Sequence, residues 1–152
     1  MVILVVSTAF VAAPRVSQGW MQTTALDGDE QNVLQTLRLA RETAIHAASD
    51  VIVRRIRREH PDGTQRYALE LQLAAGPYSD NASWHGAGGN TAARFMDHPF
   101  WLRQDVSIQR GPNQFRFQSD GTADRDVSWD ISLQGVTRTV NVLGTNGWIT
   151  RS

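Results

Sequence analysis

Two residue types are missing from this chain, and it has no excess charge of either sign. Cysteine is absent, which excludes disulfide scaffolds, thiolate zinc sites and cysteine nucleophiles. Lysine is absent too, because all 15 basic residues are arginine, and this excludes Schiff-base chemistry and a P-loop lysine. The 15 basic residues are balanced by 15 acidic ones, which argues against a wholly electrostatic grip on nucleic acid.

The chain has 152 residues, which is long enough for one domain with a hydrophobic core and too short for two ordinary domains. Its hydrophobic content of 41% is ordinary for a soluble globular protein and unsuited to a polytopic membrane protein or a disordered chain. The composition therefore predicts a single globular domain, apart from an amino end of different character.

Met1 to Ala13 forms that exception, because it reads MVILVVSTAFVAA without a charge and is followed by Pro14-Arg15. As a helix it would cover ~20 Å, which is short of the ~30 Å hydrocarbon core of a bilayer. It also lacks the basic n-region of a secretory signal, and a core helix that is apolar on all sides needs a larger protein around it. We therefore expect a membrane or filament helix whose first turn precedes Met1, with about five or six more apolar residues upstream.

The apolar side chains of this stretch, with the proline that closes it, are the candidate contacts with lipid or with neighbouring helices of a filament. These residues are Val2, Ile3, Leu4, Val5, Val6, Phe10, Val11 and Pro14. We assign residues 1–26 to this helix and a linker, and residues 27–152 to a soluble domain.

A second, amphipathic helix is predicted from residue 30 to residue 49. The break before it is Asp27-Gly28-Asp29, and Asp27 stands three residues ahead of Glu30, at the spacing of a capping box, while Asp29 is an equal candidate for the N-cap. Apolar residues then repeat at intervals of three and four, with polar residues on the other face. The apolar positions are Val33, Leu37, Ala40 and Ala44, with Leu34 and Ile45 widening the stripe.

After Asp50 the hydrophobic period changes from helical to alternating. The clearest strand covers 127–134, where apolar residues alternate with polar ones. Short connections with Asp-Gly and Asn-Gly turns require antiparallel pairing, because a parallel crossover needs about a dozen residues or more. The predicted fold class is α+β: an apolar helix, an amphipathic helix and an antiparallel β-sheet domain. The other predicted strands cover 51–58, 66–73, 102–109, 114–118 and 136–143.

No catalytic, cofactor or metal site emerges from the sequence. The four histidines lack the spacing of metal ligands, and no nucleophile motif is present. Residues 119–126 gather three carboxylates without the ligand spacing of an EF-hand loop, so we expect a β-turn and a solvated loop there. The long connection from Ala74 to Pro99 contains Tyr78, Trp84 and His85, and it keeps open an alternative in which the chain is a secreted β-domain binder or enzyme.

Arginines in the second half of the chain are the remaining candidates for function. Arginine offers a planar fork that binds phosphate or carboxylate groups in a bidentate manner. A net charge near zero favours instead a solvated surface on which these arginines pair with aspartates. The candidates for contact with DNA or a partner protein are Arg110, Arg116, Arg125, Arg138 and Arg151.

Several segments, in their order along the chain, resemble the GspH/FimT family of minor pseudopilins and pilins. Leu37 to Ile45, running into Val51-Ile52-Val53, is similar to the family's L-x-x-A-R-x-x-A-I helix end and first strand. Phe115 to Thr122 is similar to the family's F-x-x-D-G-T turn, and Gly144 to Arg151 to its closing G-R-x-R segment. Met1–Pro14 likewise looks like the apolar helix of type IV pilin-like proteins.

The resemblance implies a pilin-like fold and a structural, non-catalytic role without a cofactor. It implies a subunit of a type II secretion or type IV pilus-like filament, held in the inner membrane by a single-pass helix before assembly, with the β domain in the periplasm. Its partners would be other pseudopilins or pilins and the assembly platform. The family's leader and G-F-T-L-x-E cleavage segment would lie directly upstream of Met1.

The resemblance also brings an alternative function, since some FimT-like members bind DNA for uptake through basic residues near the carboxyl end. Trp148 stands where the family commonly has arginine, which weakens that carry-over. The structural subunit is therefore the first hypothesis, and a DNA-binding minor pilin is the second.

Overall fold

The structure is a computed structural model that describes residues 3–74 and 99–152, with side chains described from residue 23 onward within those ranges. It begins with one long helix, α1 (Ile3–Ala47). Eight strands follow among the described residues: β1 (Val51–Glu59), β2 (Gln65–Leu73), β3 (Phe100–Trp101), β4 (Val106–Gln109), β5 (Gln114–Phe117), β6 (Val127–Leu133), β7 (Val136–Val142) and β8 (Ile149–Arg151).

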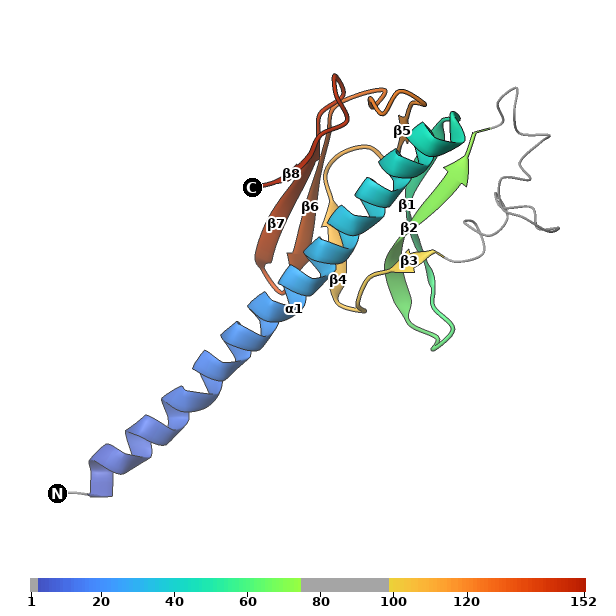
Figure 1. The fold of residues 1–152 in the computed structure, drawn as a ribbon. Helices are drawn as coiled ribbons and strands as arrows, with labels where there is room; N and C mark the ends of the chain where they lie inside the picture. Colours follow the sequence, from blue (N-terminus) through green and yellow to red (C-terminus); the bar gives the residue numbers. More distant parts are fainter. Residues whose placement is uncertain (1–2, 75–98) are drawn as a thin grey trace.

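The strands form two four-stranded antiparallel sheets in the described part of the chain. The first sheet has the order β3-β2-β1-β5, and the second has the order β4-β6-β7-β8. Helix α1 lies across both sheets, and its amino-terminal part runs on beyond them (Figure 1). This arrangement confirms the predicted α+β class, in which a helical amino end is followed by antiparallel sheets.

The predicted break at Asp27-Gly28-Asp29 is wrong, because α1 continues through these residues without interruption. Local propensity favours a break there, but the segment packs against the sheets, and this packing outweighs the propensity. Leu26 and Asp29 are buried, and the two aspartates pair with Arg138 and Arg103 at 3.4 and 3.6 Å. The chain therefore has one helix where the sequence pattern predicted two. The assigned boundary between residues 26 and 27 falls inside this helix and stays a prediction.

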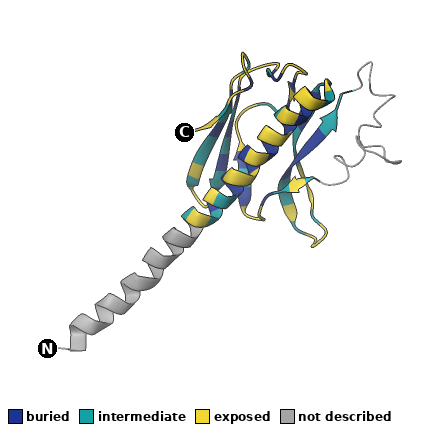
Figure 2. Ribbon diagram, viewed as in Figure 1, coloured by how far each residue is buried: buried dark blue, intermediate teal, exposed yellow. Residues whose placement is uncertain are grey.

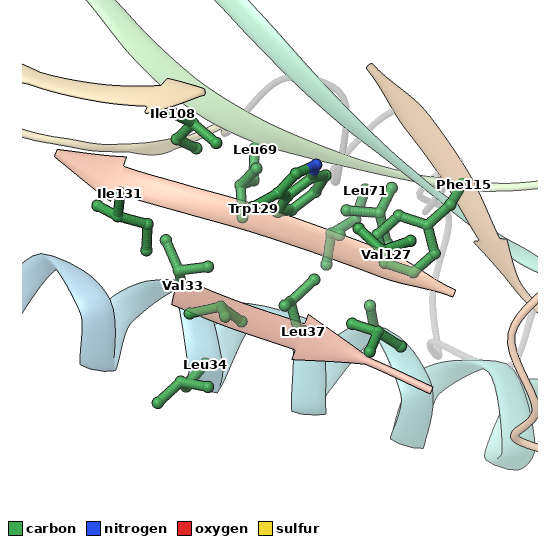
Figure 3. Close-up of a cluster of buried hydrophobic side chains, with 14 of the residues drawn as sticks. Val33, Leu34, Leu37, Leu69, Leu71, Ile108, Phe115, Val127, Trp129 and Ile131 are labelled. Atoms are coloured by element: carbon green, nitrogen blue, oxygen red, sulfur yellow. The ribbon is translucent and has the colours of Figure 1, made fainter. Parts of the chain in front are cut away.

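One face of α1 supplies the helical part of the hydrophobic core. Leu26, Val33, Leu37, Ala40 and Ala44 recur with the helical period and are all buried, and Figure 2 shows this face turned toward the sheets while the opposite face is exposed. The alanines at the carboxyl end of this face leave room for the sheets to approach the helix. Figure 3 shows Val33, Leu34 and Leu37 of this helix in the same cluster as side chains from the strands.

The sheets contribute large side chains to the same core. Trp129 on β6 is fully buried, and its ring lies edge-on to Phe115 of β5, with 5.5 Å between the ring centroids. The indole N–H donates to the carbonyl oxygen of Pro112 at 3.0 Å, which satisfies the one polar group of this side chain. Every second residue of β6 is buried, so the clearest alternation in the sequence marks an inner strand of the core.

The strand predictions differ from the structure at three places. Only the second half of the strand predicted over 102–109 is β4, because residues 102–105 carry the chain from β3 in one sheet to β4 in the other. That turn is closed by the N–H of Val106, which donates to the carbonyl of Arg103 at 3.2 Å. Strands β3 and β8 escape prediction because two and three residues are too few to show an alternating period. The other five predicted strands agree with the structure to within one residue at each end.

Gly28→Ala is expected to stabilise the protein by about 0.5–1 kcal/mol, because glycine inside a helix is costly and alanine is the best helix former. A Cβ atom on Gly28 would meet nothing closer than the guanidinium Nη2 of Arg103, at 3.9 Å. Urea unfolding of the two proteins measures the change in the free energy of unfolding.

Gly121→Ala is the matched control for this substitution. Gly121 has a φ of +84°, and a Cβ there would lie 2.8 Å from Cδ1 of Ile45, so alanine should destabilise the protein. If Gly28→Ala also lowers the free energy of unfolding, the uninterrupted helix is contradicted.

Candidate functional site

The five arginines predicted to contact DNA or a partner come from five different segments of the β domain. Arg151 on β8 is exposed and has no ion pair among the described residues. The other four arginines each pair with an aspartate, as the net charge near zero predicted. Contact of these arginines with DNA stays a prediction. The pairs are Arg110 with Asp130 at 3.5 Å, Arg116 with Asp50 at 3.3 Å, Arg125 with Asp124 at 3.1 Å and Arg138 with Asp27 at 3.4 Å.

The predicted packing residues from Ile3 to Pro14 fall within α1, and Val2 lies outside the described residues. Across the described ranges, no helix has an apolar stretch long enough to cross a membrane. Contact of this stretch with lipid or with other helices therefore stays a prediction.

A joint between α1 and two distant turns is built around Arg41. Its Nε–H donates to the carbonyl oxygen of Gly121 at 2.9 Å, and its Nη2 donates to the carbonyl oxygen of Asn146 at 3.3 Å. Gly121 lies in the connection from β5 to β6, and Asn146 lies in the connection from β7 to β8. One guanidinium therefore ties the carboxyl end of the helix to the connection between the two sheets and to a connection within the second sheet.

Glycine is required where these two turns touch. Gly147 has a φ of +63°, and a Cβ on it would lie 2.0 Å from the carbonyl oxygen of Gly121 and 2.9 Å from Nε of Arg41. A side chain does not fit at such distances. Arg41, Gly121 and Gly147 thus meet at one point, although each belongs to a separate one of the family-like motifs. Sequence reasoning finds the three motifs but misses their contact, because linear spacing does not indicate it.

The three carboxylates of residues 119–126 make separate contacts, and only that of Asp120 lies within the turn itself. Asp120 accepts hydrogen bonds from the N–H and the hydroxyl of Thr122 at 2.9 and 2.7 Å, and these bonds hold the pKa of Asp120 below its ordinary value. Asp124 and Asp126 each accept a bond from a backbone N–H elsewhere in the chain. Among the residues that the structure describes, no three metal-ligating side chains come together.

Two adjacent carboxylates lie on the buried face of α1. Asp29 and Glu30 are only 3% and 2% exposed. Asp29 pairs with Arg103 at 3.6 Å, and Oε1 of Glu30 has no hydrogen-bond partner within the described ranges. Burial raises the pKa of Asp29, and the positive charge of Arg103 opposes this effect only in part. Sequence reasoning missed the pair because it placed both residues at the solvated start of a helix.

The histidines do not gather into a site in the described part of the chain. His46 is exposed near the end of α1. His60 lies with Nδ1 at 3.0 Å from Oδ1 of Asp62 and edge-on to the ring of Trp101. The other two histidines, His85 and His98, lie outside the described residues, as do Tyr78 and Trp84 of the long connection.

Comparison with solved structures shows that the fold is pilin-like. Two crystal forms of the type IV minor pilin FimU of Pseudomonas aeruginosa are similar to this chain. One is 13% identical with a TM-score of 0.55, over 90% of this chain and 92% of the FimU chain. The other is 12% identical with a TM-score of 0.51, over 86% of this chain and 91% of the FimU chain. No protein-family model and no curated protein matches the sequence.

Asp29→Asn is expected to stabilise the protein at neutral pH, because it removes a buried charge that Arg103 compensates only in part. The pKa of Asp29 is raised in the folded state, so the wild type gains stability as pH falls through the raised pKa toward the ordinary value of 3.8. The advantage of the variant should therefore be largest near pH 7 and shrink by about pH 3. Urea unfolding at the two pH values measures it, and a larger advantage in acid would contradict the raised pKa.

Arg41→Ala should cost about 1–3 kcal/mol, because it removes two charge-assisted hydrogen bonds and leaves two carbonyl groups without their donor. Arg38→Ala is the matched control, since Arg38 lies one turn earlier on α1, is exposed and has no ion pair among the described residues. It should change the free energy of unfolding by less than about 0.5 kcal/mol. Equal effects of the two substitutions would show that the joint contributes nothing to stability.

Proposed function

We propose that this protein is a structural, non-catalytic subunit of a type IV pilin-like filament, of the GspH/FimT minor pseudopilin kind that its motifs resemble. One observation carries the proposal: a single helix, α1, begins in a charge-free apolar stretch and ends packed across two antiparallel sheets. The similar fold of the minor pilin FimU supports it.

The helix offers what filament packing requires, which is apolar surface and not chemistry. Residues 1–13 carry no charge, and each Val, Ile, Leu or Phe that is fully buried against a neighbouring helix contributes about 1.5–3 kcal/mol. The carboxyl-terminal half of α1 and the two sheets form one core, in which Trp129, Phe115 and Phe117 are fully buried. A helical stalk that continues into a head built from the same helix and two sheets suits a subunit that packs side by side with others.

Before assembly, in this proposal, the same helix holds the chain in the inner membrane as a single-pass anchor, with the β domain in the periplasm. The uncharged residues 1–13 support this placement, and a β domain without cysteine needs no disulfide to fold in the periplasm. The partners are other pilins or pseudopilins and the assembly platform of a type II secretion or type IV pilus-like system.

Neither alternative function gains support from the described residues. Four of the five arginines considered for DNA contact are paired with aspartates. The aromatic residues considered for a ligand loop, Tyr78 and Trp84, lie outside the described residues. DNA binding and ligand binding by the long connection both stay predictions.

Val6→Asp should remove the protein from filaments, because a carboxylate would have to be buried among apolar helices. Val6→Leu keeps the apolar surface and should be incorporated like the wild type. Immunoblots of sheared filaments and of whole cells, from cells that express the partner pilins, measure the incorporated fraction. Incorporation of Val6→Asp at the wild-type level would contradict packing through this helix.

Cell fractionation tests the membrane part of the proposal separately. In cells that lack the assembly platform, the chain should sediment with the inner membrane and resist carbonate extraction. Recovery in the soluble fraction alone would contradict the membrane-held state while leaving filament packing untouched.

A further inference from the structure

The outer edges of the two sheets differ in how their backbone groups are satisfied. Beside β5, the N–H of Asp124 donates to the carbonyl of Arg116 at 2.9 Å, so the following loop covers this edge. Beside β4, the guanidinium of Arg55 donates to the carbonyls of Ile108 and Arg110 at 3.2 and 2.6 Å. Proteins commonly cover sheet edges because an open edge pairs with another strand.

Strand β8, at the outer edge of the second sheet, has no such cover among the described residues (Figure 1). Ser152 and Thr139 exchange both of their backbone hydrogen bonds, which sets the alternation of bonded and non-bonded pairs along β7 and β8. Thr150 therefore bonds to β7, whereas the N–H and C=O groups of Ile149 and Arg151 point away from it. These outward groups make no hydrogen bond within the described ranges.

A surface groove lies between α1 and this open edge. Trp148 on its wall is 62% exposed. Strand-binding sites combine such features, because backbone groups at an edge supply affinity and a neighbouring groove accepts a side chain. The groove has a volume of about 230 Å³ and is lined by Arg38, Arg41, Glu42, Gly147, Trp148 and Ile149.

The charges around the groove indicate what an added strand carries. Arg38 and Arg151 have no ion pair among the described residues, whereas seven other arginines pair with an aspartate or a glutamate. Glu42 is the one acidic residue in the lining. A surplus of positive charge at this edge favours a strand that brings carboxylates.

We propose that β8 binds an extended acidic segment of another protein as an added strand. An apolar side chain of the segment enters the groove against Trp148 and Ile149, and carboxylates two residues away, ~7 Å along the strand, reach Arg38 and Arg151. Ile149 and Arg151 share one face of β8 because they are two residues apart. The apolar residue and the carboxylates of the bound segment are therefore two residues apart, and their side chains project from the same face of the added strand.

A second copy of this chain is a poorer occupant than an acidic segment. Antiparallel pairing of β8 with β8 along its whole length would place each Arg151 opposite Ile149 of the other copy, so neither arginine would gain the acidic cross-strand partner that stabilises a pair. The binding proposed at this edge is independent of packing through α1, so its failure and the failure of filament assembly are separate results.

The test uses the full 152-residue chain in detergent micelles and a capped heptapeptide with Glu, Leu and Glu at its even positions and Thr at the others. Calorimetry should give a Kd below about 1 mM, and a peptide with Lys in place of Glu should bind at least about tenfold more weakly. Amide hydrogen exchange should slow by about tenfold or more at Ile149 and Arg151 and stay unchanged at Thr150, which already bonds to β7. Failure of the Glu peptide to bind overturns the proposal.

Two N-methylated forms of the Glu peptide separate strand addition from side-chain contact. In an added strand, alternate N–H groups face β8 and the others face solvent. One form is methylated at the amides of the even positions and the other at those of the odd positions. One of the two forms should therefore lose binding, and the other should bind like the unmethylated peptide. Equal binding of both forms would overturn strand addition.

Substitutions at the edge complete the test. Trp148→Ala should weaken binding by about tenfold or more, while Leu143→Ala, at an exposed neighbour outside the groove, should leave it unchanged.

Arg151→Pro should bind more weakly than Arg151→Ala, because both lack the charge but only proline lacks the outward N–H. Thermal unfolding confirms that each variant is folded. Equal binding by the two Arg151 variants, or displacement of the peptide by duplex DNA, would overturn the proposal.

Discussion

Burial of one face of α1 against both sheets is the contact on which the rest of the fold depends. The two sheets share no strand, so the buried residues of each, such as Leu71 and Ile131, are covered by the helix that lies across them (Figure 3). Each fully buried leucine or valine of the helix, including Leu37, contributes about 1.5–3 kcal/mol. This gain exceeds the cost of about 1 kcal/mol for a glycine inside a helix, and it explains why α1 runs through Asp27-Gly28-Asp29 without a break.

Arginine side chains that bind backbone carbonyls fix the periphery of this core. Arg41 reaches Gly121 and Asn146, which are 80 and 105 residues away in the sequence, and Arg55 holds the carbonyls beside β4 in the same manner. A planar guanidinium serves two acceptors at once, whereas a lysine ammonium is a single compact charge on a flexible stem. These two positions thus have a physical reason for arginine. Nothing in the structure explains the absence of lysine from the exposed surface.

The sequence predicts a helix or strand well where the residues that it buries recur with a regular period. Strand β6 buries every second residue, and its bounds follow from that alternation. The break expected at Asp27-Gly28-Asp29 fails because Arg103 and Arg138, which pair with its aspartates, come from distant strands and turns. The joint at Arg41 and the pairs of Arg110, Arg116 and Arg138 with aspartates are long-range contacts too, so no local pattern reveals them. Strand β8 could not be predicted from the sequence for a different reason, since three residues are too few to show an alternating period.

The net neutrality of the chain conceals an uneven distribution of charge. Acidic and basic residues are equal in number, and seven described arginines meet an acid within the head. At the edge of β8 this compensation is missing, because Arg38 and Arg151 have no ion pair among the described residues. An apolar helix packs with any apolar neighbour, whereas an open edge flanked by arginines discriminates by backbone register and charge. Taken together, the two proposals assign assembly and recognition to different parts of the molecule, with the stalk supplying the non-directional contact and β8 the directional one.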